Sequence, residues 1–363
     1  AGYAVEEAKG EALQAGLPPN PELDVGVEGW KSGNDEGGHE LLVGISQTLP
    51  ISGARKMARK AGMFGAAAAT AEAEALRLEV AGAARSLFYE TLAAQERLKL
   101  LSEAGADADA LASLTRIRFE QGDIAEVDLM RAVAEKHRYL AETEKADKLL
   151  KGLRSQLAEL CGIPDAELPE CAGGNALEAS MLPDPAELKG ALLAHPRGKA
   201  RELHEAQAAA ALKAVRRKAI VEPAVRIGMR RDDDSKDNAL DVGISIPLPL
   251  FDRNQGEEAE AHAREQRIRA ENDSDLRELV RMCLALRAEA GAAIAEAAIT
   301  RNNVIPQLAA AYAAVEKALE LGGVTVFETL AAKRDIAEAQ LALIESERKA
   351  HVALITLNTL LGR

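Results

Sequence analysis

The chain has 363 residues, a net charge of −13, 28% charged residues and only 3% aromatic residues. The acidic balance argues against a nucleic-acid-binding protein, because phosphate recognition needs basic surfaces. So few aromatic residues supply little bulk for one thick globular core, and the composition favours long helices packed through small side chains. No run approaches the roughly 18 apolar residues of a membrane-spanning helix, so a role inside a membrane would require a β-barrel.

The sequence contains no signature of catalysis or of cofactor binding. We find no glycine-rich phosphate loop, no nucleophile elbow and no converging cluster of His, Asp and Glu, so we do not expect an enzyme. The six histidines are scattered without ligand spacing, and no metal site is predicted. Cys161 and Cys171 flank a short proline-containing segment, and the sequence leaves open whether they form a disulfide or remain two thiols.

Residues 22–48 carry the first strong pattern, in which apolar and polar side chains alternate along two stretches joined by the polar loop 31–39. Alternation with a period of two is typical of strands with one apolar and one polar face, so this segment predicts a β-hairpin. A soluble sheet resting on a core would show the same pattern, and the hairpin alone leaves both settings open. Its apolar positions are Leu23, Val25, Val27, Val43 and Ile45.

Two helices are predicted next, over residues 53–118 and 124–161, with a break at Gly122 and Asp123. At 1.5 Å per residue the first would reach roughly 100 Å, which is far longer than the helices of ordinary globular domains. Small and apolar residues recur along it at alternating spacings of three and four, as in a coiled coil. These seam positions are Leu76, Val80, Ala83, Leu87, Thr91, Ala94, Leu98 and Leu101.

The same series of elements then recurs. Residues 163–185 are rich in proline and glycine and predict a linker rather than a helix. Beyond it the sequence predicts a helix, a hairpin and two further helices, of which the first is interrupted only by Pro306: 196–220, 223–247, 256–321 and 325–361. The apolar strand positions of this second hairpin are Val225, Ile227, Val242 and Ile244.

This recurrence indicates a tandem duplication. Phe119–Ile124 matches Leu319–Val324 at an offset of 200, and Val43–Ser46 matches Val242–Ser245 at an offset of 199. Offsets that stay so nearly constant along the chain are the signature of an internal repeat. We therefore divide the chain into a first structural repeat, an equatorial linker and a second structural repeat, over residues 1–162, 163–185 and 186–363.

The two hairpins supply four strands, which are too few to close a barrel. An open strand edge is not viable in lipid, so strands that span a membrane would have to be pooled from several chains. In that setting we expect the nine apolar strand positions to face lipid. An arginine on the opposite face, at Gly228 or Ser245, is expected to be better tolerated than one on the lipid face.

Residues 241–256, DVGISIPLPLFDRNQG, resemble the strand-to-helix crossing of the cobalt–zinc–cadmium resistance branch of the TolC-like outer-membrane efflux factors. Residues 17–23, LPPNPEL, are similar to the segment that leads into the barrel in the first half of the same branch. Residues 118–124, RFEQGDI, and 320–325, ELGGVT, resemble the tips of the helical hairpins of this family. The resemblance extends over about residues 15–362.

The resemblance implies a mainly α fold with a small β part, the tandem-duplicated TolC-like fold. Three copies would form a homotrimer with a 12-stranded transmembrane β-barrel and a periplasmic α-barrel of coiled-coil helices. It implies the exit duct of a tripartite efflux system in the outer membrane of a Gram-negative bacterium, exporting heavy-metal cations. The duct would dock on a periplasmic adaptor and an inner-membrane RND-type pump. The alternative is a soluble periplasmic coiled-coil scaffold or adaptor.

Two groups of site residues follow from the resemblance. The hairpin tips would meet the adaptor through Arg118, Gly122, Asp123, Ile124, Gly322, Gly323, Val324 and Thr325. Related channels carry acidic residues where the helices converge, so Glu126, Asp128 and Glu328 would form an acidic ring at the periplasmic aperture. The alternative is that these are ordinary first-turn acids, each stabilising a helix N-terminus by about 0.3–1 kcal/mol.

The chain departs from the family pattern in two places. Only residues 1–15 precede the first hairpin, where the family has a longer helix and an N-terminal region that can carry a lipid-bearing cysteine. A fragment is one explanation, and whether the protein is lipidated stays open. Arg118 in the first tip corresponds to Ala318 in the second, so the two tips are not expected to bind the adaptor alike.

Overall fold

The computed structural model describes residues 2–28, 39–174, 177–232, 236–320 and 323–363. The chain forms two compact units, one of Ala1–Leu76 with Leu193–Arg277 and the other of Arg77–Leu192 with Glu278–Arg363. Each unit therefore draws on both halves of the sequence. None of the helices in the described ranges combines the length and the apolar character that crossing a membrane requires.

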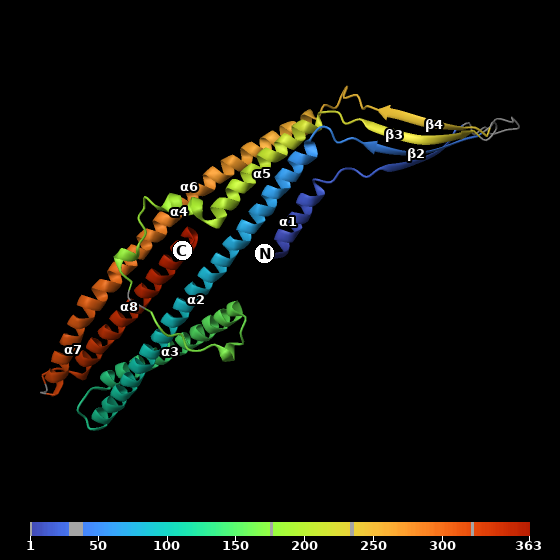
Figure 1. Ribbon diagram of the computed structural model, residues 1–363. Coiled ribbons are helices and arrows are strands. Elements are labelled where there is room, and N and C mark those ends of the chain that lie inside the picture. The colour runs from blue at the N-terminus through green and yellow to red at the C-terminus, as the bar shows by residue number, and fades with distance from the viewer. Residues whose placement is uncertain (1, 29–38, 175–176, 233–235, 321–322) are drawn as a thin grey trace. The chain divides into compact units, whose positions relative to one another are not determined.

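The first unit contains one antiparallel sheet of four strands in the order β1-β2-β3-β4. Figure 1 shows the strands at one end of this unit, beyond the ends of the helices that belong to it. The two predicted hairpins pair with each other through β2 and β3, so strands from both halves of the chain share one sheet. The strand bounds are Glu22–Glu28, Glu40–Thr48, Ala224–Asp232 and Asn238–Ser245.

The helices of the first unit pack through very small side chains. They are α1, the first part of α2, α5 and the first part of α6, with whole-helix bounds Gly2–Gln14, Ala54–Glu120, Pro196–Lys218 and Gln255–Ile299. A Cβ atom on Gly62 of α2 would lie 2.5 Å from the Cα atom of Ala12 in α1. On α2 and α5, Ala68 and Ala208 are buried. Small residues at these positions let the helices approach closely, as the composition predicts.

The second unit contains the remaining parts of α2 and α6 together with α3, α4, α7 and α8, at Glu126–Cys161, Leu188–Ala194, Ile305–Glu320 and Val326–Leu361. Leu101 and Ala108 of α2 form a buried cluster with Tyr139 and Ala146 of α3. A salt bridge of 2.8 Å between Lys333 Nζ and an Asp107 carboxylate oxygen connects α8 to α2. The predicted linker contains the 3₁₀ turns η1 and η2, at Asp165–Glu167 and Ala179–Met181.

The long helix predicted over residues 256–321 is divided in the structure. A π-helical turn, η3 (Thr300–Val304), separates α6 from α7. Pro306 lies in the first turn of α7, where it can donate no backbone N–H and its ring displaces the carbonyl four residues earlier. The wider π turn just before it absorbs this mismatch, so the interruption lies upstream of the proline itself.

The start of the second half also differs from the prediction. The helix expected over 196–220 ends at Lys218, and the additional short helix α4 precedes it. His195 separates the two helices, because its imidazole Nδ1 accepts a hydrogen bond of 3.0 Å from the Arg197 N–H and so caps α5. Pro196, at the first position of α5, adds a fixed helical φ and has no N–H to satisfy.

Equivalent backbone geometry recurs 200 residues apart. The N–H of Asp123 donates to the carbonyl of Arg118 at 2.9 Å, and the N–H of Gly323 donates to the carbonyl of Ala318 at the same distance. Gly162 and Gly362 end α3 and α8 with φ values of 68° and 74°, in the left-handed region that glycine tolerates best. The sequence repeat therefore has a matching structural repeat at both ends of each return helix.

Candidate functional site

The first candidate surface is the apolar face of the sheet. The strand register aligns Leu23, Ile45, Ile227 and Val242 in one row across all four strands. Their exposed fractions are 69%, 56%, 57% and 61%, although each side chain is apolar. In a folded protein such a continuous apolar face needs a covering.

The structure places all nine predicted strand positions on this face. Strand residues two apart point to the same side, and directly paired residues share a side. By this rule the register joins Leu23, Val25, Val27, Val43, Ile45, Val225, Ile227, Val242 and Ile244, and adds Leu41, Met229 and Leu240, which were not among the nine. That lipid covers this face stays a prediction.

The opposite face of the sheet is polar and partly closed by ion pairs. Arg226 donates to a carboxylate oxygen of Asp241 at 2.9 Å, and Arg230 donates to Glu40 at 3.0 Å. These pairs join β3 to β4 and β3 to β2, respectively. Sequence alternation predicted a polar face but not these pairings, because they depend on the register between strands, and the Arg230–Glu40 pair joins residues 190 positions apart.

The expectation that Gly228 tolerates arginine is wrong. A Cβ atom at this position would lie 2.8 Å from the carbonyl oxygen of Val43 and 2.9 Å from the Cα atom of Gly44. Both are backbone atoms of the neighbouring strand β2, so they cannot move away without displacing the strand. Gly44 and Gly228 are directly paired, and the close approach of the two strands explains why both are glycine.

The second candidate surface is the first hairpin tip, between α2 and α3. Gly122 follows the last turn of α2 and has a φ of +84°. The Asp123 N–H donates to the carbonyl of Arg118, which lies in that last turn. Ile124 is half-buried. Ala125 occupies the N-cap position of α3, where it has no side-chain hydrogen bond to offer.

The second tip, before α8, is capped differently. The Thr325 hydroxyl accepts a hydrogen bond from the Glu328 N–H at 3.3 Å, and the Glu328 carboxylate accepts one from the Thr325 N–H at 2.7 Å. This is a reciprocal capping box, and the sequence already contains its Thr-x-x-Glu pattern. Gly323 is exposed and Val324 half-buried, while Gly322 lies outside the described residues. The structure thus adds a second inequality between the tips, Ala125 against Thr325.

The three acidic candidates for the aperture all lie in first helical turns. Glu126 and Asp128 begin α3, with Glu126 exposed and Asp128 half-buried, and Glu328 begins α8. The Glu328 carboxylate is held in the capping box, so for this residue the helix-stabilising role is present in the structure. An acidic ring needs several chains and remains a prediction for all three.

Cys161 and Cys171 are free cysteines in the structure, so the disulfide alternative is not realised. Cys161 is exposed in the last turn of α3, whereas the Cys171 N–H is bound by the side-chain oxygen of Gln95 at 3.0 Å. Burial raises the pKa of the Cys171 thiol, partly opposed by Arg154. Cys283 is fully buried, and burial raises its pKa.

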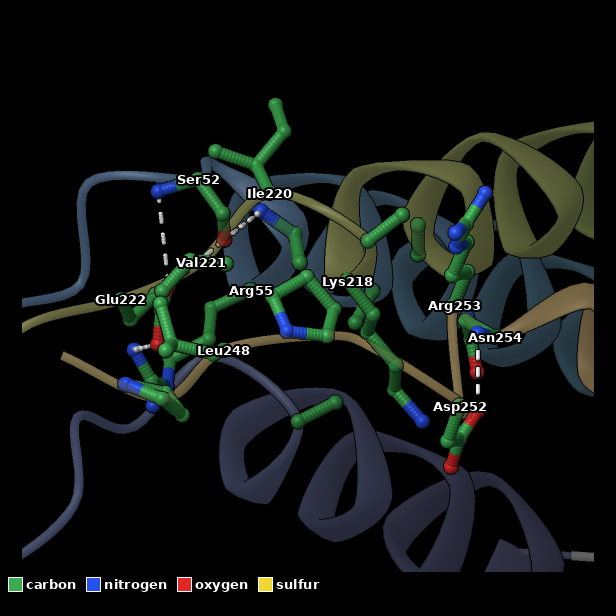
Figure 2. Close-up of a pocket in the computed structure, with 17 residues that line it drawn as sticks. Ser52, Arg55, Lys218, Ile220, Val221, Glu222, Leu248, Asp252, Arg253 and Asn254 are labelled. Atoms are coloured by element: carbon green, nitrogen blue, oxygen red, sulfur yellow. Dashed lines mark hydrogen bonds and ion pairs between the residues drawn. The ribbon is translucent and has the colours of Figure 1, made fainter.

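The first unit also contains a cavity of about 620 Å³ where the strands give way to the helices. Figure 2 shows Arg55 and Glu222 at one side of it and Arg253 at the other, with Lys218 between them. The Ser52 hydroxyl donates to Glu222 at 2.5 Å, and an Arg55 nitrogen lies 3.2 Å from the same carboxylate. The sequence prediction did not include this cavity. Its sequence signals are the basic runs at the start of α2 and the end of α5.

In the described part of the chain, no three His, Cys, Asp or Glu side chains come together as a metal site.

Comparison with known proteins identifies the family. The sequence profile of the outer membrane efflux protein family matches residues 1–162 and 224–363. The chain is 26% identical over 363 residues to the cobalt-zinc-cadmium resistance protein CzcC of Cupriavidus metallidurans, an alignment that covers 99% of this chain and 85% of that relative.

Solved structures of outer-membrane channels share the fold. Crystal structures of CusC superpose with a TM-score of 0.83 at 18% identity, over 98% of this chain and 86% of that chain. VceC from Vibrio cholerae superposes with a TM-score of 0.80 at 20% identity, over 99% of this chain and 91% of that chain. These matches show the tandem-duplicated fold of the TolC-like channels. With the family profile matched over most of its length, this chain belongs to the outer membrane efflux protein family and is an outer-membrane channel rather than an enzyme.

Proposed function

We propose that three copies of this chain form the exit duct of a tripartite system that exports heavy-metal cations. Members of the family are trimeric outer-membrane channels that work with a periplasmic adaptor and an inner-membrane RND-type pump. The protein is an outer-membrane channel with periplasmic helices. We propose that this chain itself forms a trimer, that it works with such an adaptor and pump, and that its cargo is heavy-metal cations.

The observation that supports a trimer is that the sheet has two free edges. The order β1-β2-β3-β4 leaves one edge of β1 and one edge of β4 without a partner strand in the described chain. Unpaired backbone groups are too costly in lipid, so an apolar sheet of this kind has to be closed by other copies. Three sheets of four strands give the 12-stranded barrel that we propose, with the apolar face toward lipid and the ion-paired face toward the lumen.

Two observations support a cationic cargo. The similar protein CzcC is by its name a cobalt–zinc–cadmium resistance protein. The net charge of −13 gives this chain a negative field, and clefts lined by one sign of charge raise the local concentration of the opposite ion. We propose that divalent metal cations pass through the duct and that carboxylates at the aperture, from Glu126, Asp128 and Glu328, attract them.

The cargo is tested by growth on metals. A bacterial strain that lacks its own metal-exporting channel receives this chain together with its pump and adaptor. We expect restored resistance to cobalt, zinc and cadmium salts, and unchanged sensitivity to organic antibiotics. Restored antibiotic resistance without restored metal resistance would overturn the metal cargo and leave the channel function intact.

Docking at the tips is tested with a double substitution. Ile124 and Val324 occupy corresponding positions just beyond the two tip glycines, and Lys substituted at both would bring two charges to an apolar contact. We expect Ile124→Lys with Val324→Lys to abolish resistance while the trimer stays as stable as wild type. Gln156→Lys, an added charge at an exposed position far along α3, is the control and should keep resistance. Full resistance in the double variant would contradict docking here.

We also propose the division into repeats as the evolutionary unit of the chain, with repeats over residues 1–162 and 186–363 and a linker over 163–185. The recurring turn and helix-end geometries 200 residues apart support it.

A further inference from the structure

The N-terminus of α2 carries charges of the wrong sign for a helix start. Arg55 and Lys56 lie in its first turn, Arg59 and Lys60 follow one turn later, and the first turn contains no acidic residue. The partial positive charge of a helix N-terminus favours acidic side chains there, as α3, α6 and α8 have. In a chain of net charge −13, this basic run is an exception that helix stability does not explain.

A second basic run lies against the first. Helix α5 ends in Arg216, Arg217 and Lys218. Arg217 donates to the carbonyl oxygen of Ser52, just before α2, at 3.3 Å. The end of α5 also lies beside the start of α6, because the Asn254 side-chain amide donates to the Val215 carbonyl at 2.8 Å.

These residues form one basic belt, of which Arg55, Lys218 and Arg253 line the cavity where the strands give way to the helices and the others lie in the same segments. We define the belt as Arg55, Lys56, Arg59, Lys60, Arg216, Arg217, Lys218 and Arg253. Only four acidic residues accompany it in the same segments, namely Glu222, Asp252, Glu257 and Glu258. Glu222 pairs with Arg55, Glu257 with Lys218 and Glu258 with Arg216, so the belt keeps an excess of positive charge.

The belt adjoins exposed apolar residues. Leu248, Leu250 and Phe251 lie in the connection from β4 to α6, with exposed fractions of 75%, 65% and 91%. Leu248 also lines the cavity, and Figure 2 shows it on the side of Arg55 and Glu222. In the other direction the chain continues into the apolar face of the sheet. An apolar surface that ends in a row of Lys and Arg is the arrangement that meets hydrocarbon and then anionic headgroups.

We propose that the basic belt binds the phosphate groups of membrane phospholipids in the leaflet on the helix side of the sheet. The cavity receives one phosphodiester headgroup between Arg55, Lys218 and Arg253, and the acyl chains lie over Leu248 and Phe251. This proposal rests on the proposed function in one respect, namely that the sheet spans the membrane. The belt then sets the depth of the channel in the bilayer, because charge holds it at the headgroups while the apolar face stays in the hydrocarbon.

The test compares two double variants that each remove two positive charges. Arg253→Gln with Lys218→Gln removes belt charges and leaves the Arg55–Glu222 pair in place. Arg264→Gln with Arg267→Gln is the control, on exposed side chains further along α6 whose partners are Glu260 and Glu271. Purified protein in a neutral detergent is titrated with phosphatidylglycerol, and bound lipid is counted by native mass spectrometry. Parallel titrations use diacylglycerol, glycerol phosphate and inorganic phosphate.

We expect wild type and control to bind phosphatidylglycerol alike, and the belt variant to bind it roughly 30-fold more weakly, at about one factor of five per basic residue. Diacylglycerol should bind weakly to all three proteins. Equal binding by the belt variant and the control would overturn the proposal. Glycerol phosphate or inorganic phosphate binding as tightly as the lipid would replace it with a site for soluble anions. Trimer assembly and insertion into liposomes are measured on the same samples. Their failure in wild type would contradict the proposed function, whereas intact insertion with no loss of lipid from the variant contradicts only the belt.

Discussion

Substitution of Val242 by arginine tests whether the apolar face of the sheet meets lipid. Val242 lies in the middle of β4, is paired with Ile227 and is 61% exposed in the single chain. At about 3.4 Å per residue it lies roughly 10 Å from the nearer end of the strand, so its side chain would be near mid-depth in a bilayer. An arginine at that depth destabilises a membrane barrel by about 2–4 kcal/mol, or roughly 6–12 kcal/mol over three chains. On a face covered by water the change would stay within about 0.5 kcal/mol.

The next residue provides the matched control. Gly243 lies on the opposite face of the same strand, and a Cβ atom there would meet only the Arg226 side chain, at 3.9 Å. Gly243→Arg therefore adds the same side chain to the proposed lumen. The assay is the loss of folded trimer in liposomes with increasing urea, read from heat-dependent mobility on SDS gels. We expect Val242→Arg to abolish assembly, and Gly243→Arg to lower the urea midpoint only slightly, because the new arginine lies opposite Arg226 on a polar face. Equal urea midpoints for both variants would refute the lipid-facing assignment.

Three further predictions concern the close strand pair, the aperture and the buried thiol. Gly228→Ala should destabilise the trimer by about 1–3 kcal/mol per chain, since its Cβ meets backbone atoms of β2, whereas Gly26→Ala, which meets nothing within 4 Å, should be neutral in the same urea assay. Asp128→Asn with Glu328→Gln should abolish both the cation selectivity of the channel and its block by trivalent cations in planar bilayers. Stability should change little, because Gln also completes a capping box. Unchanged selectivity and block would leave only the helix-capping role. Cys283 should resist maleimide at neutral pH until the protein unfolds, because burial excludes the reagent and raises the pKa of the thiol; rapid labelling of the folded protein would show that the second unit opens locally.

The strands and their faces could be predicted from the sequence because the signal is local. Alternation at period two assigned Leu23, Val25 and Val27 to one side before any pairing was known, and the register agrees. The helix breaks at Gly122 and Gly162 were predictable for the same reason, since both positions need a positive φ that glycine supplies at little strain. The duplication could also be predicted from the sequence, because equivalent turns in the two halves require equivalent residues.

Other features depended on contacts between segments far apart in the chain. The pairing of β2 with β3 joins residues about 180 positions apart, and it alone reveals that Gly228 is held against Gly44. The same holds for the ion pair of Arg230 with Glu40. Alternation states which face a residue occupies, but not which atoms of a neighbouring strand lie opposite or how closely.

Composition and periodicity thus determined that this chain has four amphipathic strands, long coiled-coil helices and two hairpin tips, because each of these is encoded within a few turns of chain. Only the tertiary structure decided that the ends of α5 and the starts of α2 and α6 meet at one cavity. In the sequence, Arg55, Lys218 and Arg253 lie in three separate segments, and nothing in any one segment shows that the other two lie beside it. Their charges act together only because folding places all three around one cavity, and Coulomb interactions depend on distance in space rather than along the chain.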